Sequence, residues 1–400
     1  MSYLKNSTSP ALWKLLAVSC IAAFCALLPA DALPAMAQWF HVSASRVEGI
    51  LSWYLLGYGI GPLLYGPLSN RFGRKPGLMM GFCAAGFGML LSLLGFAVHA
   101  LPLVMVGRLI AGIGASAGLV IGMIMLNETN DTVQARKKYS IIVMFFSFTP
   151  ALAMALGGIL ATHLGLISIF MVMPILLMLV MLVVLLLPET YHDQPIPLHL
   201  GAMMKHYGLG LLHFRFMTLV IVMMSATAIT YVFNGISPLI AVEQLHISPQ
   251  TFGELAIIPS LGLLCGAVVS ASLAERISAS RLLLVAFAIA GLSGLVMLVS
   301  FLAAWVNGVS LLAPAFLLFF AAAIIIPNTA MSALKEARDP AMAASLLNAM
   351  ALIVSSVVLA LSGIGYTVIS SLALPIALLV LVTLGLISLL MHKTNGPSMS

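Results

Sequence analysis

The chain has 400 residues, of which 62% are hydrophobic and only 7% are charged, and its formal net charge is +6. A soluble domain carries about 25% charged residues, so the composition excludes a soluble surface and indicates a polytopic helical membrane protein. The basic residues are spread over short loops, which favours membrane topology over a nucleic-acid partner. The four cysteines lie in apolar segments without metal-ligand spacing or a disulfide framework.

Apolar runs of about twenty residues recur along the whole chain, and each is long enough to cross a ~30 Å hydrocarbon core as a helix. We predict twelve spans, at residues 12–37, 47–68, 77–98, 101–127, 139–162, 165–187, 216–241, 251–273, 281–304, 309–332, 341–367 and 371–391. Residues 35–37 (Ala-Met-Ala) resemble a signal-peptide cleavage site, but we expect an uncleaved first span.

Lysine and arginine positions predict the orientation. Of the 17 basic residues, fifteen lie in the N-terminus, the loops after even-numbered spans, the central loop or the C-terminus: Lys5, Lys14, Arg71, Arg74, Lys75, Arg136, Lys137, Lys138, Lys205, Arg215, Arg276, Arg281, Lys335, Arg338 and Lys393. The opposite loops hold only Arg46, and Arg108 lies within span 4. Because cytoplasmic loops carry the excess of Lys and Arg, we expect both termini in the cytoplasm.

The chain divides into two similar halves. Residues 188–215 form a long polar stretch, expected to be a cytoplasmic linker between an N-terminal six-helix bundle (1–187) and a C-terminal one (216–400). Leu68 and Arg71 after span 2 recur as Leu273 and Arg276 after span 8, at an offset of 205 residues. Duplicated halves are typical of transporters, whose substrate site lies between them near mid-membrane. The predicted fold class is all-α, with twelve transmembrane helices in two pseudo-symmetric six-helix bundles.

Three segments carry a family resemblance: GPLSNRFGRKP at residues 66–76, GRLIAGIGA at 107–115, and Thr149-Pro150 followed by Gly157-Gly158. They resemble signatures of the major facilitator superfamily in the loop after span 2, in span 4 and in the exporter-type span 5. The similarity extends over essentially the whole chain and is strongest to bacterial drug:proton antiporters of the Bcr/CflA type. It implies alternating access of two bundles around a central cavity, a small-molecule substrate and protons as partners.

Three positions depart from this pattern. Asn70 stands where the loop signature has Asp, and Leu27 stands where the first span of Bcr-type proteins has Asp. Asp31 lies about one helical turn further along. Span 5 also has Met154 where these proteins often carry a second proline.

Arg108 and Asp31 are the predicted proton-coupling residues. An arginine within a span is costly and normally faces the bundle interior or a water-filled cavity. Both residues lie about seven positions from the outer ends of their spans, or ~10 Å deep at 1.5 Å per residue, so an Arg–Asp pair is geometrically possible. The alternatives are a static structural pair, or an Asp31 that is solvated near the outer surface.

The basic loop between spans 2 and 3 is the predicted cytoplasmic gate. Its members are Gly66, Asn70, Arg71, Gly73, Arg74 and Lys75. Their cations are expected to pair with acids at neighbouring helix ends and with helix C-terminal dipoles, and the resemblance implies a latch for the outward-open state. The alternative is that these cations set topology alone. Without the family's carboxylate, Asn70 predicts a latch that is weaker or differently connected.

The sequence also suggests packing residues, cavity residues and further acids. Pro150, Gly157 and Gly158 are expected to bend span 5 and allow close packing. Cavity candidates are Trp53, Tyr54, Tyr58, Tyr231, Phe233 and Asn234, against the alternative that each faces lipid or core. Among the other acids, we expect Glu128 to form a surface ion pair, Glu243 and Glu254 to lie in water, and Glu48 to sit at the outer mouth of span 2. His163 is expected to be a solvated loop residue.

Together these features predict a proton-coupled exporter of a small amphiphilic molecule (a drug, siderophore or metabolite) in a bacterial inner membrane. We expect a monomer without cofactor or metal. The sequence shows no nucleotide-binding signature, so a proton or ion gradient is the expected energy source. Enzyme activity is not expected. One alternative is a proton-coupled uptake symporter for a small metabolite, and another is a non-transporting membrane sensor or assembly factor.

Overall fold

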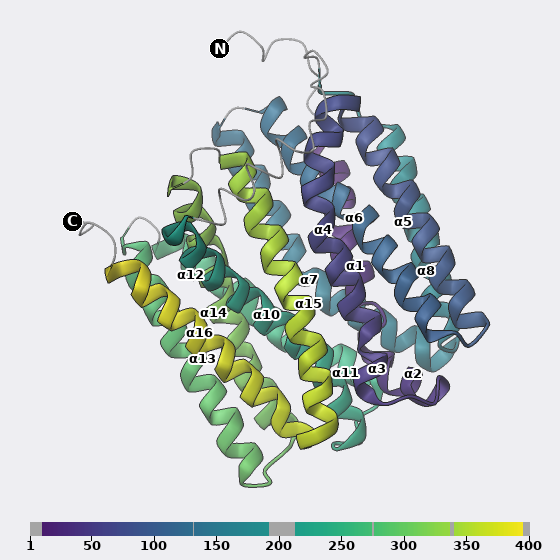
Figure 1. The fold of residues 1–400 in the computed structure, drawn as a ribbon, viewed down its shortest axis with the longest axis vertical. Coiled ribbons are helices and arrows are strands. Elements are labelled where there is room, and N and C mark those ends of the chain that lie inside the picture. Colours follow the sequence, from purple (N-terminus) through teal and green to yellow (C-terminus); the bar gives the residue numbers. More distant parts are fainter. Residues whose placement is uncertain (1–9, 131, 192–212, 274–275, 337–339, 395–400) are drawn as a thin grey trace.

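The computed structural model describes residues 10–130, 132–191, 213–273, 276–336 and 340–394. In these ranges the chain forms helices and no strands (Figure 1). They are α1 (Leu12–Leu27), the 3-10 turn η2 (Ala30–Ala32), α2 (Leu33–Trp39), α3 (Ala44–Val47), α4 (Gly49–Phe72), α5 (Arg74–Ala97), α6 (Leu101–Thr129), α7 (Thr132–His163), α8 (Ile167–Leu185), α10 (Phe214–Glu243), α11 (Pro249–Leu255), α12 (Ile257–Leu273), α13 (Ala279–Leu302), α14 (Gly308–Glu336), α15 (Pro340–Ile369), the 3-10 turn η3 (Ser370–Leu372) and α16 (Ala373–Thr394).

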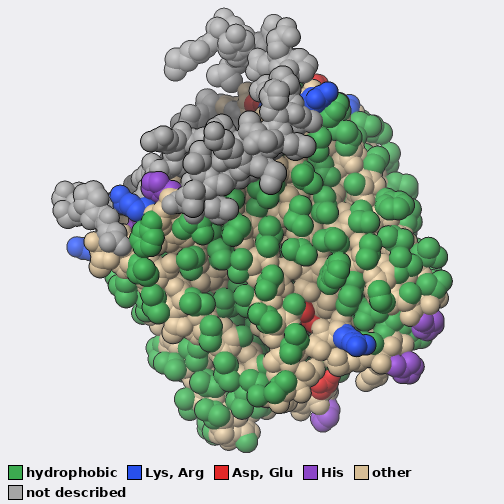
Figure 2. All heavy atoms as spheres, viewed as in Figure 1, with side chains coloured by type: hydrophobic (Ala, Val, Ile, Leu, Met, Phe, Trp, Pro, Cys, Tyr) green, Lys and Arg blue, Asp and Glu red, His purple; other side chains and the backbone are tan. Residues whose placement is uncertain are grey.

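The outside of the molecule is apolar. Large hydrophobic side chains such as Leu152, Leu292 and Val368 are exposed, and Figure 2 shows hydrophobic side chains over the middle of the visible face with charged groups and histidines toward its two ends. Within the described ranges, nine segments are long and apolar enough to cross a membrane. Such a surface is stable when lipid covers it.

The observed helices follow the predicted spans closely. Each span overlaps a long helix, and the apolar segment Ser345–Thr394 contains both α15 and α16. The all-α fold class is confirmed, while the number of membrane crossings stays a prediction. Two spans are broken: the first between α1 and α2, and the eighth between α11 and α12. The first break follows from Pro29, which has no backbone N–H to continue α1.

Helices α1–α8 lie together and helices α10–α16 lie together (Figure 1). We call these groups the N-terminal and C-terminal bundles, and we call the end that carries the loop around Gly73 the inner end. The two groups touch where α3 and α4 meet α15 and where α7 meets α11 and α12. The domain boundaries stay a prediction, because residues 192–212 of the expected linker lie outside the described ranges.

Small residues bring backbones together within and between the bundles. A Cβ at Gly57 of α4 would collide with the carbonyl oxygen of Leu109 of α6, and one at Gly112 with that of Tyr54. Gly59 of α4 faces α15, where its Cβ would stand 3.0 Å from the carbonyl oxygen of Ala349. Glycine therefore permits the close α4–α6 and α4–α15 approaches, as expected for packed membrane helices.

Candidate functional site

Arg108 is completely buried in α6 and its guanidinium holds the broken first span. Nη1 donates to the carbonyl of Cys25 at 2.8 Å, Nη2 to Ala26 at 2.9 Å, and Nε to Ile50 at 2.9 Å. Inside a helix the carbonyl of Cys25 would accept from residue 29, but Pro29 has no N–H to donate. The cation therefore satisfies carbonyls left free at the C-terminal end of α1, where the helix dipole also favours positive charge.

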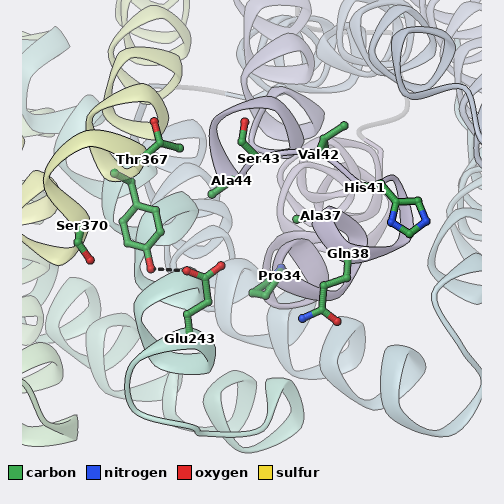
Figure 3. Close-up of a pocket in the computed structure, with 11 residues that line it drawn as sticks. Pro34, Ala37, Gln38, His41, Val42, Ser43, Ala44, Glu243, Thr367 and Ser370 are labelled. Carbon is green, nitrogen blue, oxygen red and sulfur yellow. Dashed lines mark hydrogen bonds between the residues drawn. The ribbon is translucent and has the colours of Figure 1, made fainter.

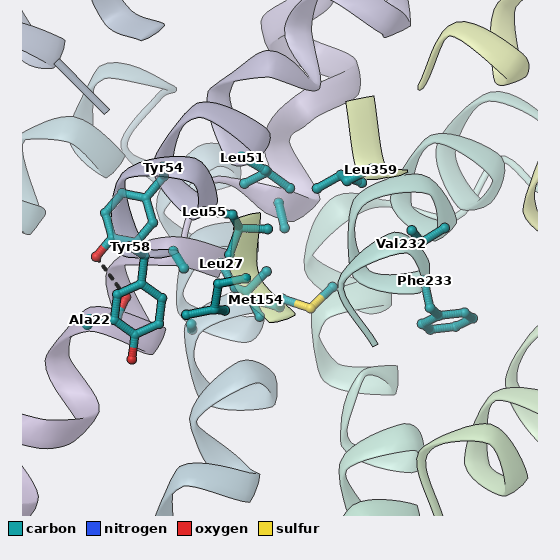
Figure 4. Packing of buried hydrophobic residues seen from close by; sticks show 14 of the residues in the cluster. Ala22, Leu27, Leu51, Tyr54, Leu55, Tyr58, Met154, Val232, Phe233 and Leu359 are labelled. Carbon is teal, nitrogen blue, oxygen red and sulfur yellow. Dashed lines mark hydrogen bonds between the residues drawn. The ribbon is translucent and has the colours of Figure 1, made fainter. Parts of the chain in front are cut away.

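The same guanidinium lies over an aromatic ring. Its Cζ is 4.1 Å from the ring centroid of Tyr54, whose hydroxyl donates to the carbonyl of Ala22 at 2.8 Å (Figure 4). Both contacts connect α4 and α6 to α1. Arg108 and Tyr54 thus fix the last turns of α1 just before the break.

The expected pair of Asp31 and Arg108 is not formed. Three carbonyls and a ring surround the arginine, and neither carboxylate oxygen of Asp31 has a hydrogen-bond partner among the described residues. The expectation failed because it placed Asp31 on a continuous α-helix, whereas residues 30–32 form a separate 3-10 turn between α1 and α2. The reading of a solvated Asp31 is also wrong, since the residue is 0% exposed.

Asp31 instead faces the other bundle. A Cβ at Gly253 of α11 would stand 2.6 Å from Oδ2 of Asp31, 2.8 Å from Cα of Ala155 and 2.9 Å from the carbonyl oxygen of Met154. The carboxylate of the N-terminal bundle thus fits a notch that only glycine leaves open. Burying a carboxylate charge without a partner is unfavourable, so this contact favours a protonated Asp31.

Helix α7 runs beside this contact, with Pro150 inside it. Its two consecutive glycines face different bundles. A Cβ at Gly157 would collide with the carbonyl oxygen of Leu28 in the break of the first span, and one at Gly158 would lie 2.7 Å from the carbonyl oxygen of Pro249 in α11. This glycine pair lets α7 pack between the broken segment and the C-terminal bundle.

At the inner end, Arg74 joins three parts of the N-terminal bundle. Its Nη2 lies 2.6 Å from Oε1 of Glu128 at the end of α6, and its Nη1 donates to Ser69 at 2.8 Å and to Asn70 at 2.6 Å. Its guanidinium also lies 4.7 Å from the ring centroid of Tyr191. Asn70 therefore takes part as an acceptor in this network, although it lacks the family's carboxylate.

Glu189 completes the inner network and is a residue whose role the sequence did not reveal. Its Oε1 accepts from the backbone N–H of Arg74 at 2.9 Å and its Oε2 from that of Lys75 at 3.0 Å, at the start of α5. The turn into α5 needs Gly73, which has φ +97° and whose Cβ would stand 2.8 Å from Oε2 of Glu189. An acid at a helix N-terminus is favourable. The position of Glu189 directly after the predicted span 6 was the sequence signal from which this role could have been predicted.

The other loop residues complete the inner surface. Lys75 donates to the carbonyl of Leu185 at the end of α8 at 2.7 Å, which is the expected contact with a helix C-terminus. Arg71 is exposed, and with Lys75, Glu189 and Tyr191 it lines a surface cavity of about 410 Å³. Nothing lies within 4 Å of a Cβ at Gly66.

The six cavity candidates are not gathered in one cavity. Trp53 is 39% exposed, Tyr54 supports α1, and Phe233 packs edge-on against Phe319 of its own bundle at 5.5 Å. Tyr58 is buried with a hydroxyl that has no partner within the described part of the chain. Tyr231 is half-buried and Asn234 buried on α10. None of the six lines the surface cavity at the inner end or the outer groove that is described next.

The second surface cavity is an outer groove of about 770 Å³ between the bundles, lined by Pro34, Ala37, Gln38, His41, Val42, Ser43, Ala44, Glu243, Tyr366, Thr367 and Ser370 (Figure 3). On the side of the groove formed by the C-terminal bundle, Glu243 of α10 accepts from the hydroxyl of Tyr366 of α15 at 2.8 Å. Glu254 and His163 are exposed, as expected. Glu48 was expected at the outer mouth of α4. It is 0% exposed, so the sequence-based expectation did not foresee its burial.

Two bundles of apolar helices, with a buried arginine inside one of them and buried carboxylates at their contact, define the architecture of a membrane transporter. The sequence profile of the Major Facilitator Superfamily matches residues 15–337. The chain belongs to this superfamily, whose members are membrane transporters and not enzymes.

Relatives and solved structures agree with this placement. The chain is 22% identical over 268 residues to an uncharacterized transporter of Rickettsia bellii, covering 66% of this chain and 65% of that protein. It is 31% identical over 224 residues to the multidrug resistance protein MdtL of Klebsiella pneumoniae, covering 55% of each. The chain thus spans less than two thirds of these relatives. A D-xylose-proton symporter structure has the same fold, with TM-score 0.75, 16% identity and 96% and 97% coverage.

Proposed function

We propose that this protein is a proton-coupled exporter of small amphiphilic molecules in a bacterial inner membrane, with both termini in the cytoplasm. The observation that carries the proposal is the fully buried carboxylate of Asp31 at the contact between the bundles, which has no hydrogen-bond partner among the described residues. A carboxyl group that is buried neutral in one arrangement of the bundles and hydrated in the other binds a proton in one and releases it in the other.

The coupling follows from the broken first span. When the bundles separate at their outer ends, Asp31 leaves the Gly253 notch and exchanges its proton with the outer solution. Closure then buries the neutral acid. Arg108 acts as a positioning residue, because it anchors the end of α1 to which the Asp31 segment is attached. The Arg74 network at the inner end acts as the gate that favours outward opening.

Two observations support export as the direction of transport. The Thr149-Pro150 and Gly157-Gly158 elements resemble the exporter signature, and Gly157 and Gly158 lie between the broken segment and the C-terminal bundle. A relative at 31% identity is named a multidrug resistance protein. The substrate is proposed to bind between the bundles, near Tyr58 and Tyr231, and the protein is proposed to act as a monomer.

Proteoliposomes with an acidic lumen test the direction. An antiporter moves its substrate toward the acidic side, while a symporter moves it away from that side. Ethidium and radiolabelled chloramphenicol are suitable probes, because neither is trapped by a pH gradient alone. We expect protein-dependent accumulation in the acidic lumen that nigericin abolishes. Depletion of the probes from that lumen would indicate uptake symport, and no gradient-dependent movement of any probe would count against transport.

A further inference from the structure

Glu48 is a second acid of the N-terminal bundle that reaches the C-terminal bundle, and it forms no part of the proposed function. It precedes α4 at the outer end and is 0% exposed. Neither of its carboxylate oxygens has a hydrogen-bond partner within the described ranges. A Cβ at Gly363 of α15 would stand 3.3 Å from Cβ and Cγ and 3.4 Å from Oε2 of Glu48.

In the part of the chain that the structure describes, the surroundings of Glu48 offer no compensating charge. Helix α15 has no charged residue along its whole length, and its titratable group, Tyr366, donates to Glu243 of α10. On the N-terminal side, Arg46 of α3 is exposed. The cation of α6, Arg108, is engaged by three carbonyls. An ionised Glu48 would therefore be buried against an apolar helix without a counter-ion, which is strongly unfavourable.

The contact that buries Glu48 is also tight further along the same helices. Ser356 of α15 donates to the carbonyl of Ser52 of α4 at 2.6 Å, and Gly59 lies against Ala349. Separation of α4 from α15 would expose Glu48 to the outer groove described above, so its hydration is tied to whether the outer ends are closed.

We propose that Glu48 is a second proton-binding site, which locks the outer end closed when it is protonated. Closing the contact around Gly363 requires the neutral acid, and loss of its proton favours separation of α4 from α15. The closed arrangement thus binds one more proton at this site than the open one, so closure weakens as the outer pH rises. The inference rests on the proposed alternating access, and it adds a site that Asp31 does not account for.

The test follows the outer opening without any substrate. Spin labels at Ser43→Cys and Thr367→Cys, which line opposite sides of the outer groove (Figure 3), report its width by electron–electron distance measurement in a chain whose four native cysteines are replaced. The comparison is made in an Asp31→Asn background, so that only Glu48 of the two buried acids titrates. We expect the closed-to-open ratio to fall by up to about tenfold per pH unit as Glu48 loses its proton.

Adding Glu48→Gln to that background should remove this pH response and keep the groove closed, because glutamine is neutral and similar in size. Glu254→Gln, which alters an exposed acid at the same end, should leave it intact. Gly363→Val, which crowds Glu48, should raise the open fraction at every pH. An equal pH response with and without Glu48, or no response in the Asp31→Asn background, would overturn the proposal. Probe transport is measured separately, so its failure would count against the proposed function and not against this site.

Discussion

The carboxylate of Asp31 lies so close to Gly253 that an added Cβ would stand 2.6 Å from its Oδ2, although the two residues belong to different bundles. This relationship places a titratable group directly on the surface that must separate if the bundles alternate. It also explains why the acid can be buried without a counter-ion, since its neutral form fits a notch made of backbone.

Filling that notch should impair closure. Gly253→Ala adds a methyl group that meets Asp31 and the backbone of α7. Overpacking of this kind costs about 1–3 kcal/mol, which lowers the closed-to-open ratio by a factor between roughly 5 and 150. We expect the initial rate of probe transport in proteoliposomes to fall accordingly. Gly308→Ala is the matched control, because nothing lies within 4 Å of its Cβ. Equal rates for the two variants would show that the notch has no role in closure.

Substitutions at Arg108 test whether its hydrogen bonds or its charge alone anchor α1. Arg108→Gln leaves carbonyls of Cys25, Ala26 and Ile50 without their donor, and should lower stability by about 3 kcal/mol. Arg108→Lys keeps the charge but cannot hold three carbonyls at once, so it should be intermediate. Thermal unfolding in detergent measures this order. If lysine restored full stability, charge alone and not the fork of hydrogen bonds would anchor α1.

The pair of Arg74 and Glu128 should contribute to the gate. Single changes to Gln at either position are expected to lower transport by about three- to tenfold, and the stability effect should stay near or below about 1 kcal/mol, because Glu128 is 28% exposed. The exchanged pair, Arg74→Glu with Glu128→Arg, should recover part of the loss. Arg276→Gln, an exposed cation in the corresponding loop, is the control. Losses that are simply additive in a double Gln variant would argue against a functional pair.

Asn70 allows the family's carboxylate to be restored. Because its Oδ1 already accepts from Arg74 at 2.6 Å, Asn70→Asp should convert this contact to an ion pair and stabilise the inner network by up to about 1 kcal/mol. A rise in melting temperature that disappears at high salt would support this expectation. A fall in melting temperature would show that Glu128 and the new acid repel each other more than Arg74 attracts both.

The sequence predicted the helices well because apolar length is a strong signal, and it predicted the basic loop because Arg71, Arg74 and Lys75 stand between two such runs. The prediction from sequence failed where contacts between distant parts of the chain determine the structure. We expected a continuous first span, although Pro29 was an available signal that it breaks, and only the folded chain shows that Arg108 occupies the carbonyls at the end of α1. The burial of Glu48 depends on Gly363, which is more than three hundred residues away, and no local pattern reveals such a partner.

The most direct test of the account is proton movement in the Asp31→Asn variant. A pH-sensitive dye in the acidic lumen of proteoliposomes reports proton efflux when ethidium or chloramphenicol is added, whichever of the two the wild-type protein accumulates. We predict substrate-dependent proton efflux for the wild type and none for Asp31→Asn, while exchange of labelled for unlabelled probe continues in both. Proton efflux of equal size in the variant would contradict the claim that Asp31 carries the coupled proton.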